Sequence, residues 1–407
     1  MTDFRSTLVV LCAAVMALSL SSNLRAQDHS KTVLVHYMPW YASKPVSGHW
    51  GWHWTMNHFD PDIVGPDGQR QVASHDYPLI DLYDSNDPDA LECQVLLMKL
   101  AGIDGAIIDW YGTEQFRDYA DVHRNTKHFI RHLKRAGLQF AICYEDQTVK
   151  HMMEAEYLPD QTDIAQGQKV LKWLADNWFI DEAYLQLKER PVLLIFGPQY
   201  FKKDHWDGFV SGLSPRPLLY GLPHLVQQTG MDGAHGWPPV TGGVEIIPDV
   251  WRKYLHSLYA RPNADESVIS VAFPGFQDIY KQAQLHDSYG FIDDRDGATF
   301  AETLDLAQKS KSQIIQIATW NDYGEGTVIE PTKAAGYRYL EHVQKHTQIR
   351  LAFGPDDLRL PVMLYQLKKQ QSQNSARIAE LKQATDLLFA GECNKARLIL
   401  EAAAKDD

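Results

Sequence analysis

Cysteine is scarce in this chain of 407 residues, which contains only four. Cys12 lies in an N-terminal apolar stretch, and Cys93, Cys143 and Cys393 are far apart in the sequence. A disulfide framework or a zinc site needs ligating residues at short, regular spacings, and no such spacing of cysteines occurs. We therefore expect the three later cysteines to be buried core thiols.

Positive charge is also limited. Lysine and arginine together number 39, against 52 aspartates and glutamates, so the formal net charge is −13. Nucleic acids and anionic membrane surfaces are bound by basic patches. We therefore expect neither a nucleic acid nor a membrane surface to be the partner of this chain.

No apolar run near the N-terminus is long enough to span a bilayer as a helix. The stretch at residues 8–20 is too short for that, follows Arg5 and is itself followed by a small residue, Ala26. This order is typical of a signal peptide, which we place at residues 1–26. The sequence thus predicts a secreted or periplasmic protein with no membrane span in the mature chain.

Short apolar segments then alternate with amphipathic ones over about 290 residues. The predicted strands are 32–37, 105–109, 139–144, 191–196, 217–220, 243–247, 268–272 and 314–318. The predicted helices are 87–101, 119–136, 164–179, 200–213, 249–260 and 300–311. Eight strands that alternate with helices predict an α/β fold, a (β/α)8 TIM barrel with enlarged βα loops.

The character of the chain changes after Gly354 and Pro355. Residues 361–373, 375–389 and 393–404 are predicted to be helices, and the last two resemble one tetratricopeptide-type pair. A single pair cannot build a solenoid. We therefore divide the mature chain into a barrel at 27–355 and a short C-terminal helical segment at 356–407, used for packing or for self-association.

Residues 314–331 (IIQIATWNDYGEGTVIEP) have the composition of an active-site edge. A buried strand there leads into carboxylates, an amide and aromatic rings, and Gly324 and Gly326 permit a sharp turn around Glu325. The alternative is a strand followed by a solvated loop with water-facing acids. That alternative accounts for Glu330, but it leaves Trp320 and Tyr323 unexplained.

Polar residues recur at the ends of the other predicted strands, where a barrel places its catalytic groups. These residues are His36, Asp109, Glu145 and Asp278, in addition to Asp322 and Glu325. Another loop, residues 48–61, holds His49, His53 and His58 among Trp50, Trp52 and Trp54. Because the histidine spacing matches no closed ligand set, we expect an aromatic wall or a packed cap there, and no metal.

Four motifs occur in a fixed order: HYMPWY, YPLIDLYDSNDP, AGIDGAIIDWYG and TWNDYGEGTVIEP. Together they resemble the glycoside hydrolase family 71/99 grouping, from residue 32 to about residue 347. Family 99 members are endo-α-mannosidases and family 71 members are α-1,3-glucanases. The resemblance implies a (β/α)8 barrel that hydrolyses α-linked oligosaccharides or polysaccharides without metal or organic cofactor.

The resemblance also implies roles for two acids. The Asn-Glu-Trp-His-Glu-Gly-Thr motif of family 99 places its catalytic pair on Asp322 and Glu325. The first would act as base toward the 2-hydroxyl of the sugar, which attacks C1, and the second as general acid and then base. Here Asp322, Tyr323 and Gly324 replace Glu, Trp and His, which brings the motif close to family 71, so α-mannan and α-1,3-glucan both remain candidate substrates.

Such chemistry needs two acids in contrasting environments. Burial against Trp320 or Tyr323 would keep one acid protonated, and an amide donor such as Asn321 would keep the other ionised. The expected substrate-binding residues are His36, Tyr37, Trp40, Asp109, Trp110, Tyr111, Glu145, Trp320, Asn321 and Tyr323. We expect the aromatic ones to share one sector of the rim, although they could instead only cap the barrel. The alternative function is a non-catalytic glycan-binding protein, and a third is an assembly role of the C-terminal helices.

Overall fold

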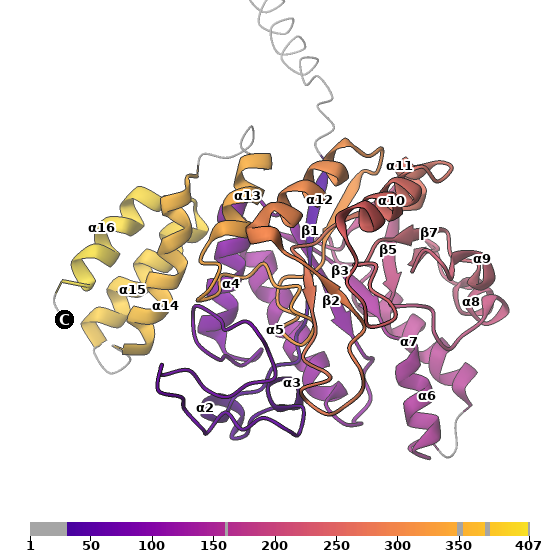
Figure 1. Ribbon diagram of the computed structural model, residues 1–407, viewed down its shortest axis with the longest axis horizontal. Coiled ribbons are helices and arrows are strands. Elements are labelled where there is room, and N and C mark those ends of the chain that lie inside the picture. Colours follow the sequence, from indigo (N-terminus) through magenta and orange to yellow (C-terminus); the bar gives the residue numbers. More distant parts are fainter. Residues whose placement is uncertain (1–30, 159–161, 348–352, 371–374, 406–407) are drawn as a thin grey trace, which may run out of the picture. The chain divides into compact units, whose positions relative to one another are not determined.

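The computed structural model describes residues 31–158, 162–347, 353–370 and 375–405 (Figure 1). Its centre is a closed sheet of eight parallel strands, in which β1 pairs with both β2 and β11 and the circle closes between β3 and β5. The strands are β1 (Thr32–Tyr37), β2 (Gly105–Trp110), β3 (Gln139–Tyr144), β5 (Arg190–Ile195), β6 (Leu218–Gly221), β7 (Gly233–His235), β8 (Val268–Ala272) and β11 (Ile314–Ile317). The predicted (β/α)8 barrel is confirmed.

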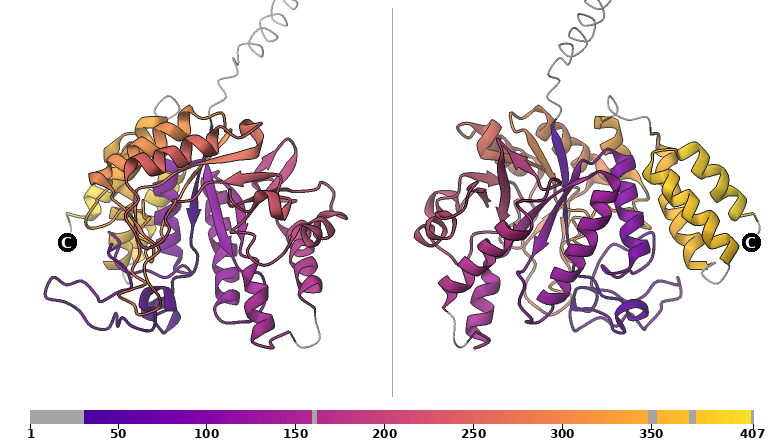
Figure 2. Two further views of the ribbon diagram at one scale, coloured as in Figure 1. Left: turned by 45° about the vertical axis from the view of Figure 1, so that its right-hand side comes forward. Right: turned by 180° about the vertical axis from the view of Figure 1, so that it is seen from behind.

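Helices connect the strands and surround the sheet, as the two views in Figure 2 show. They are α4 (Pro88–Ala101), α5 (Tyr119–Ala136), α6 (Gln147–Glu154), α7 (Asp163–Asn177), α8 (Lys203–Val210), α9 (Val226–Thr229), α10 (Pro248–Tyr259), α11 (Ala264–Ser267), α12 (Ala298–Lys309) and α13 (Arg338–Thr347). Asp87 caps α4 by accepting a hydrogen bond from the Asp89 N–H, as an N-cap residue does. Within the described residues, no helix combines the length and the apolar character needed to cross a bilayer.

Several loops at the carboxyl ends of the strands are long. The loop after β1 carries α2 (Lys44–Ser47) and α3 (Trp52–Thr55), and the loop after β8 carries the antiparallel pair β9 (Phe276–Gln277) and β10 (Phe291–Ile292). A short strand, β4 (Gln186–Leu187), pairs antiparallel with β5. The predicted signal peptide at residues 1–26 lies outside the described residues.

One predicted strand is wrong. Residues 243–247 form a loop, and the sixth strand of the barrel is β7, ten residues earlier. A Cβ on Gly233 would approach the ring of Tyr220 to 2.6 Å, so β7 needs glycine where it passes β6. A three-residue strand that begins with glycine carries too few apolar side chains to be recognised in the sequence.

Side chains alternate along each barrel strand between the barrel interior and the surrounding helices. Leu34 and Ile107 belong to a cluster inside the barrel, whereas Val35 and Ile108 belong to the cluster between strands and helices. Both faces are fully buried, so the strands read as continuous apolar runs. This alternation decides which side chains at the strand ends can reach a site at the barrel mouth.

The C-terminal helices contact the barrel through α4 (Figure 1). They are α14 (Arg359–Gln370), α15 (Ser375–Phe389) and α16 (Cys393–Ala403). On α14, Lys368 Nζ lies 2.6 Å from Glu92 Oε1 of α4, and Lys369 Nζ lies 2.8 Å from Asp87 Oδ2. Lys99 Nζ also donates to the Phe389 carbonyl of α15 at 2.8 Å. These helices thus belong to the same compact unit as the barrel.

Candidate active site

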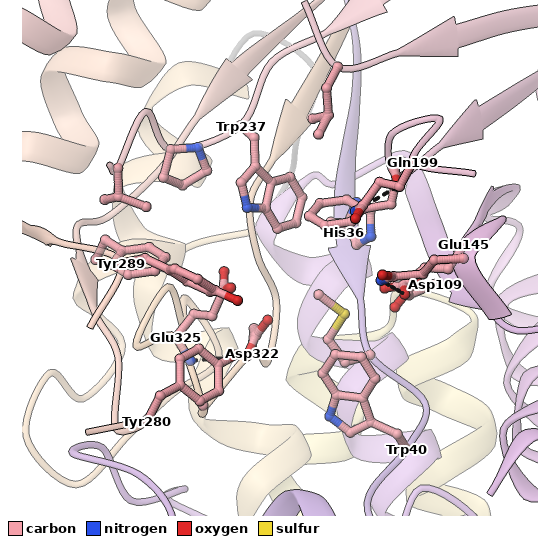
Figure 3. Close-up of a pocket in the computed structure, with 18 of the residues that line it drawn as sticks. His36, Trp40, Asp109, Glu145, Gln199, Trp237, Tyr280, Tyr289, Asp322 and Glu325 are labelled. Carbon is pink, nitrogen blue, oxygen red and sulfur yellow. Dashed lines mark hydrogen bonds between the residues drawn. The ribbon is translucent and has the colours of Figure 1, made fainter. Parts of the chain in front are cut away.

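A cavity of about 810 Å³ lies at the carboxyl ends of the barrel strands (Figure 3). Seven of the predicted site residues line it: His36, Trp40, Asp109, Tyr111, Glu145, Asp322 and Glu325. Four of these carry carboxyl groups, and the lining drawn from the described residues includes no lysine or arginine. The cavity is therefore acidic and offers no lysine or arginine of the described residues to an anionic ligand.

The loop that follows β11 holds two of the acids. The Asp322 N–H donates to Thr319 Oγ1 at 2.8 Å, and the Glu325 N–H donates to Asp322 Oδ1 at 3.1 Å. The loop is also held to the segment after β8, because the Gln277 N–H donates to the Glu325 carbonyl at 2.9 Å. Gly326 has φ +63°, and a Cβ there would lie 2.7 Å from the Gln277 carbonyl oxygen, so this turn requires glycine.

The environments of these two acids differ. Burial raises the pKa of Glu325 well above its ordinary value, the charges of Asp322 and Asp278 raise it further, and Trp237 opposes part of the rise. Burial also raises the pKa of Asp322, to about 7, but hydrogen bonds from the Glu325 and Gly324 N–H groups favour its ionised form. Burial and neighbouring charge thus favour the protonated form of Glu325, whereas backbone N–H groups favour the ionised form of Asp322.

A second pair of acids, Asp109 and Glu145, lies across the cavity from the first (Figure 3). Burial and the neighbouring charge of Glu145 raise the pKa of Asp109 well above its ordinary value. Burial raises the pKa of Glu145 to about 7, and hydrogen bonds with Gln147 and Asp109 oppose that rise. Burial and the neighbouring carboxyl group thus favour the protonated form of Asp109.

His36 lies on the inner face of β1 and is buried. Burial, together with the nearby His235, lowers its pKa to about 3, so the imidazole is neutral. Its ring meets the indole of Trp237 edge to face, with centroids 4.9 Å apart. His36 therefore adds a neutral polar group to the deep end of the cavity.

Aromatic rings form the rest of the wall. Trp40 stacks on His53 with ring centroids 4.1 Å apart and an angle of 6° between planes, and Trp52 also borders the cavity. Trp237, Tyr280 and Tyr289 line the side of Glu325 (Figure 3). The last three were not among the predicted site residues, because they lie on irregular loops after β7 and β8 that carry no periodic pattern.

The structure does not bring Tyr37 and Trp110 to the cavity. Both occupy outward positions of their strands. The Tyr37 ring stacks on Phe129 of α5 with centroids 3.8 Å apart, and the Trp110 indole donates to His123 Nδ1 at 3.2 Å. The prediction that six aromatic residues share one sector of the barrel rim is therefore wrong for Tyr37 and Trp110. Side chains alternate along a strand, so the residue that follows an inward-facing polar residue faces the helices.

Trp320, Asn321 and Tyr323 also point away from the cavity and are fully buried. Asn321 accepts from the Met38 N–H at 2.8 Å and donates to the Met38 carbonyl at 3.0 Å. Asn321 is thus not the donor that favours the ionised form of Asp322, and Trp320 and Tyr323 are not cavity walls. These side chains instead anchor the loop from behind.

Glu330 is the centre of that anchor. It is buried and accepts hydrogen bonds from Gln94 Nε2 at 2.7 Å, from the Tyr323 hydroxyl at 2.8 Å and from the Tyr83 hydroxyl at 2.9 Å. The interpretation of Glu330 as a water-facing acid is therefore wrong. Asp278, another predicted acid, also lies outside the lining, where its Oδ2 accepts from the Tyr289 N–H at 2.7 Å.

The histidines of the loop after β1 do not converge on a common point. His49 and His58 are exposed, and His53 Nε2 lies 3.4 Å from Asp118 Oδ2. Among the described residues, the group that could hold an ion is a different one, made of His36, Asp109 and Cys143, whose ligand atoms all lie within 4.8 Å of one another. Cys93, Cys143 and Cys393 are buried and free.

Comparison with known proteins gives one consistent result. The family model described as Glycosyl hydrolase family 99 matches residues 28–354. Glycoprotein endo-alpha-1,2-mannosidase of Mus musculus is 22% identical over 337 residues, 75% of this chain and 70% of that protein. A glycoprotein endo-alpha-1,2-mannosidase-like protein of Homo sapiens is 22% identical over 372 residues, 83% of this chain and 76% of that protein.

The solved structures agree in fold. The GH99 endo-alpha-mannosidase of Bacteroides thetaiotaomicron aligns with a TM-score of 0.59 at 18% sequence identity. The alignment covers 82% of this chain and 98% of that one.

Proposed function

The chain belongs to glycosyl hydrolase family 99 and is a glycoside hydrolase, and we propose that it is an endo-acting α-mannosidase. The observation that carries this proposal is the pair Asp322 and Glu325, held on one loop at the edge of an aromatic cavity. The relatives named endo-alpha-1,2-mannosidases support the choice of an α-mannosyl substrate over α-1,3-glucan.

In the proposed reaction, Glu325 is the general acid. Its raised pKa keeps the proton that the departing glycosidic oxygen must receive. Asp322 is the base, because backbone N–H groups favour its ionised form. Asp322 would take the proton of the sugar's 2-hydroxyl while that oxygen forms a bond to C1 and the glycosidic bond breaks. Ionised Glu325 would then take a proton from the water that opens this intermediate, and Asp322 would return its proton to the sugar oxygen.

The charges of the cavity support a neutral glycan as substrate. Asp109, Glu145, Asp322 and Glu325 line the cavity together with neutral aromatic rings, and the described lining contains no lysine or arginine. A phosphate or carboxylate on the substrate would be repelled by ionised Asp322 and Glu145 and would find no lysine or arginine in the described lining. We therefore propose unsubstituted α-mannan oligosaccharides rather than phosphorylated or acidic ones.

Product analysis tests the proposal. The wild-type protein should be incubated with α-1,2-linked mannan oligosaccharides and, side by side, with α-1,3-glucan oligosaccharides. Internal cleavage of the mannan alone is expected, with Glu325→Gln as the inactive control. Cleavage of the glucan alone would show that the enzyme is of the α-1,3-glucanase type. Tight binding without any cleavage would favour the alternative of a non-catalytic glycan-binding protein.

We also propose that the protein is exported. The support is the order of Arg5, the apolar stretch at residues 8–20 and Ala26. Mass spectrometry of the protein recovered from periplasm or medium should show a chain that begins close to residue 27. A full-length chain confined to the cytoplasm would contradict this proposal.

A further inference from the structure

Three side chains inside the barrel mouth come from three neighbouring strands. Asp109 of β2 and Cys143 of β3 are direct register partners, and His36 of β1 pairs with Ile107, two residues before Asp109. Asp109, Cys143 and His36 therefore point to the same, inner face of the sheet. Their ligand atoms all lie within 4.8 Å of one another, and all three residues are buried.

The hydrogen bonds of His36 leave one ring nitrogen free. Gln316 Nε2 donates to the Gly236 carbonyl at 2.9 Å, which fixes the amide so that Oε1 faces the imidazole. The His36 Nδ1–H then donates to this Oε1 in a long hydrogen bond of 3.5 Å. Nε2 carries the lone pair, is buried and has no hydrogen-bond partner among the described residues. A buried polar atom without a partner is uncommon and points to a missing ligand.

We propose that His36, Asp109 and Cys143 form a binding site for Zn²⁺ or a similar borderline divalent cation, and that this ion inhibits the enzyme reversibly. An imidazole nitrogen, a carboxylate oxygen and a thiolate are the donors that zinc takes in proteins, and three protein ligands leave a fourth position for water. On binding, the protons of the Cys143 thiol and the Asp109 carboxyl pass to solvent.

The consequence for the cavity follows from the position of Asp109. This residue lines the cavity together with Glu145. An ion held by Asp109 would replace the proton of this carboxyl group and place the ion and its bound water at the deep end of the cavity, where the sugar must bind. The inhibition thus rests on the proposed hydrolase function, whereas the binding of the ion does not.

Cys143 offers a selective test, because it is the one member of the group that does not line the cavity. The matched control is Cys93, another buried free cysteine, which lies on α4. Full-length wild type, Cys143→Ala and Cys93→Ala should be treated with chelator, freed of it and titrated with Zn²⁺ by calorimetry. Co²⁺ should be added in parallel, since a thiolate ligand gives it a near-ultraviolet charge-transfer band.

We expect one Zn²⁺ per chain in wild type and in Cys93→Ala. Loss of a direct ligand should weaken binding by at least about a hundredfold in Cys143→Ala, the upper end of what loss of an outer partner causes. The Co²⁺ band should be missing from that variant only. If Cys143→Ala does not fold, Cys143→Ser and Asp109→Asn provide the same comparison. Equal zinc binding in all variants, or no binding in wild type, would overturn the proposal.

A second readout concerns activity. Zn²⁺ should inhibit mannan hydrolysis by wild type and by Cys93→Ala, chelator should restore it, and Cys143→Ala should need at least about a hundredfold more Zn²⁺ for the same inhibition. Inhibition that is equal in Cys143→Ala would mean that the ion acts elsewhere. If no hydrolysis is found at all, the proposed function fails, and the calorimetric result still decides whether the site exists.

Discussion

The inner and outer faces of the barrel strands use adjacent residues in opposite ways. At the end of β1, His36 faces the cavity and Tyr37 packs against α5; at the end of β2, Asp109 faces the cavity and Trp110 packs among the helices. The two members of each pair differ by one position in the chain. A step of one residue along a strand therefore separates a group that can act on a substrate from one that stabilises the fold.

The same contrast holds for two glutamates of one loop. Glu325 borders the cavity, and its Oε2 is buried without a hydrogen-bond partner among the described residues. Glu330, five residues later, is enclosed by three donors and lies outside the lining. Both carboxyl groups have raised pKa values because of burial, so the raised pKa alone does not identify the reactive one. The reactive carboxyl group is identified by its position at the cavity.

The largest expected difference between the inner and outer faces of the barrel strands comes from replacing a tryptophan on the outer face. Trp110→Ala should lower the free energy of unfolding by about 3–5 kcal/mol, the usual range for deleting a buried large aromatic ring. The folded fraction should keep its normal kcat/KM, since Trp110 lies outside the cavity. Urea denaturation and steady-state kinetics measure the two quantities.

Trp40→Ala is the matched substitution on the cavity side. It should reduce kcat/KM by about tenfold, equivalent to about 1.4 kcal/mol, with a smaller change in stability than Trp110→Ala. If Trp110→Ala impaired kcat/KM while Trp40→Ala did not, the division into inner and outer faces would fail.

The acid pair comes next. Asp322→Asn and Glu325→Gln should each lower kcat by at least about a hundredfold, the scale of losing a positioned acid or base. Neither should lower the melting temperature, because burial disfavours the charged forms of both carboxyl groups and the amides that replace them carry no charge. Substantial activity in both variants would move the chemistry to Asp109 and Glu145 on the opposite wall.

Glu330→Gln tests the other side of the loop. The variant leaves hydroxyl donors of Tyr83 and Tyr323 imperfectly paired, so we expect about 1–3 kcal/mol less stability by urea denaturation. Its kcat should fall by less than about tenfold, since Glu330 does not reach the cavity. A hundredfold loss of kcat at unchanged stability would show that Glu330 takes part in the reaction.

The smallest effect concerns pH. Asp322 must be ionised to act as base, so kcat/KM should rise with pH through about 7, the pKa of this group, and fall at higher pH when Glu325 loses its proton. Glu145 raises the pKa of Asp322 by charge repulsion. In Glu145→Gln the rising limb should therefore move to lower pH. A shift to higher pH would contradict this arrangement of charges.

Sequence reasoning identifies the barrel because most strands carry apolar runs bounded by polar residues. The predicted ranges 32–37, 139–144 and 268–272 coincide with β1, β3 and β8. The same apolar runs do not show which side chains face the barrel interior and which face the helices. Since both faces of these strands are buried, the runs show no alternation, and nothing in them marks His36 as inward and Tyr37 as outward.

The rest of the site depends on long loops. The sequence predicts the acids at strand ends, because a barrel gathers its site at the carboxyl ends of its strands. It does not predict Trp237, which follows a three-residue strand, or Tyr280 and Tyr289, which follow β8 on an irregular loop. Their places are set by tertiary contacts, such as the hydrogen bond from the Tyr289 N–H to Asp278.

The contact between α14 and α4 also has a consequence for the nascent chain. Lys368 and Glu92, which lie 2.6 Å apart in the folded protein, are 276 residues apart in sequence. At about 5–20 residues per second, the ribosome makes Lys368 roughly 14–55 s after Glu92. Throughout that interval α4 lacks its contact with α14, so the side of α4 that α14 covers stays exposed until this last part of the chain is made.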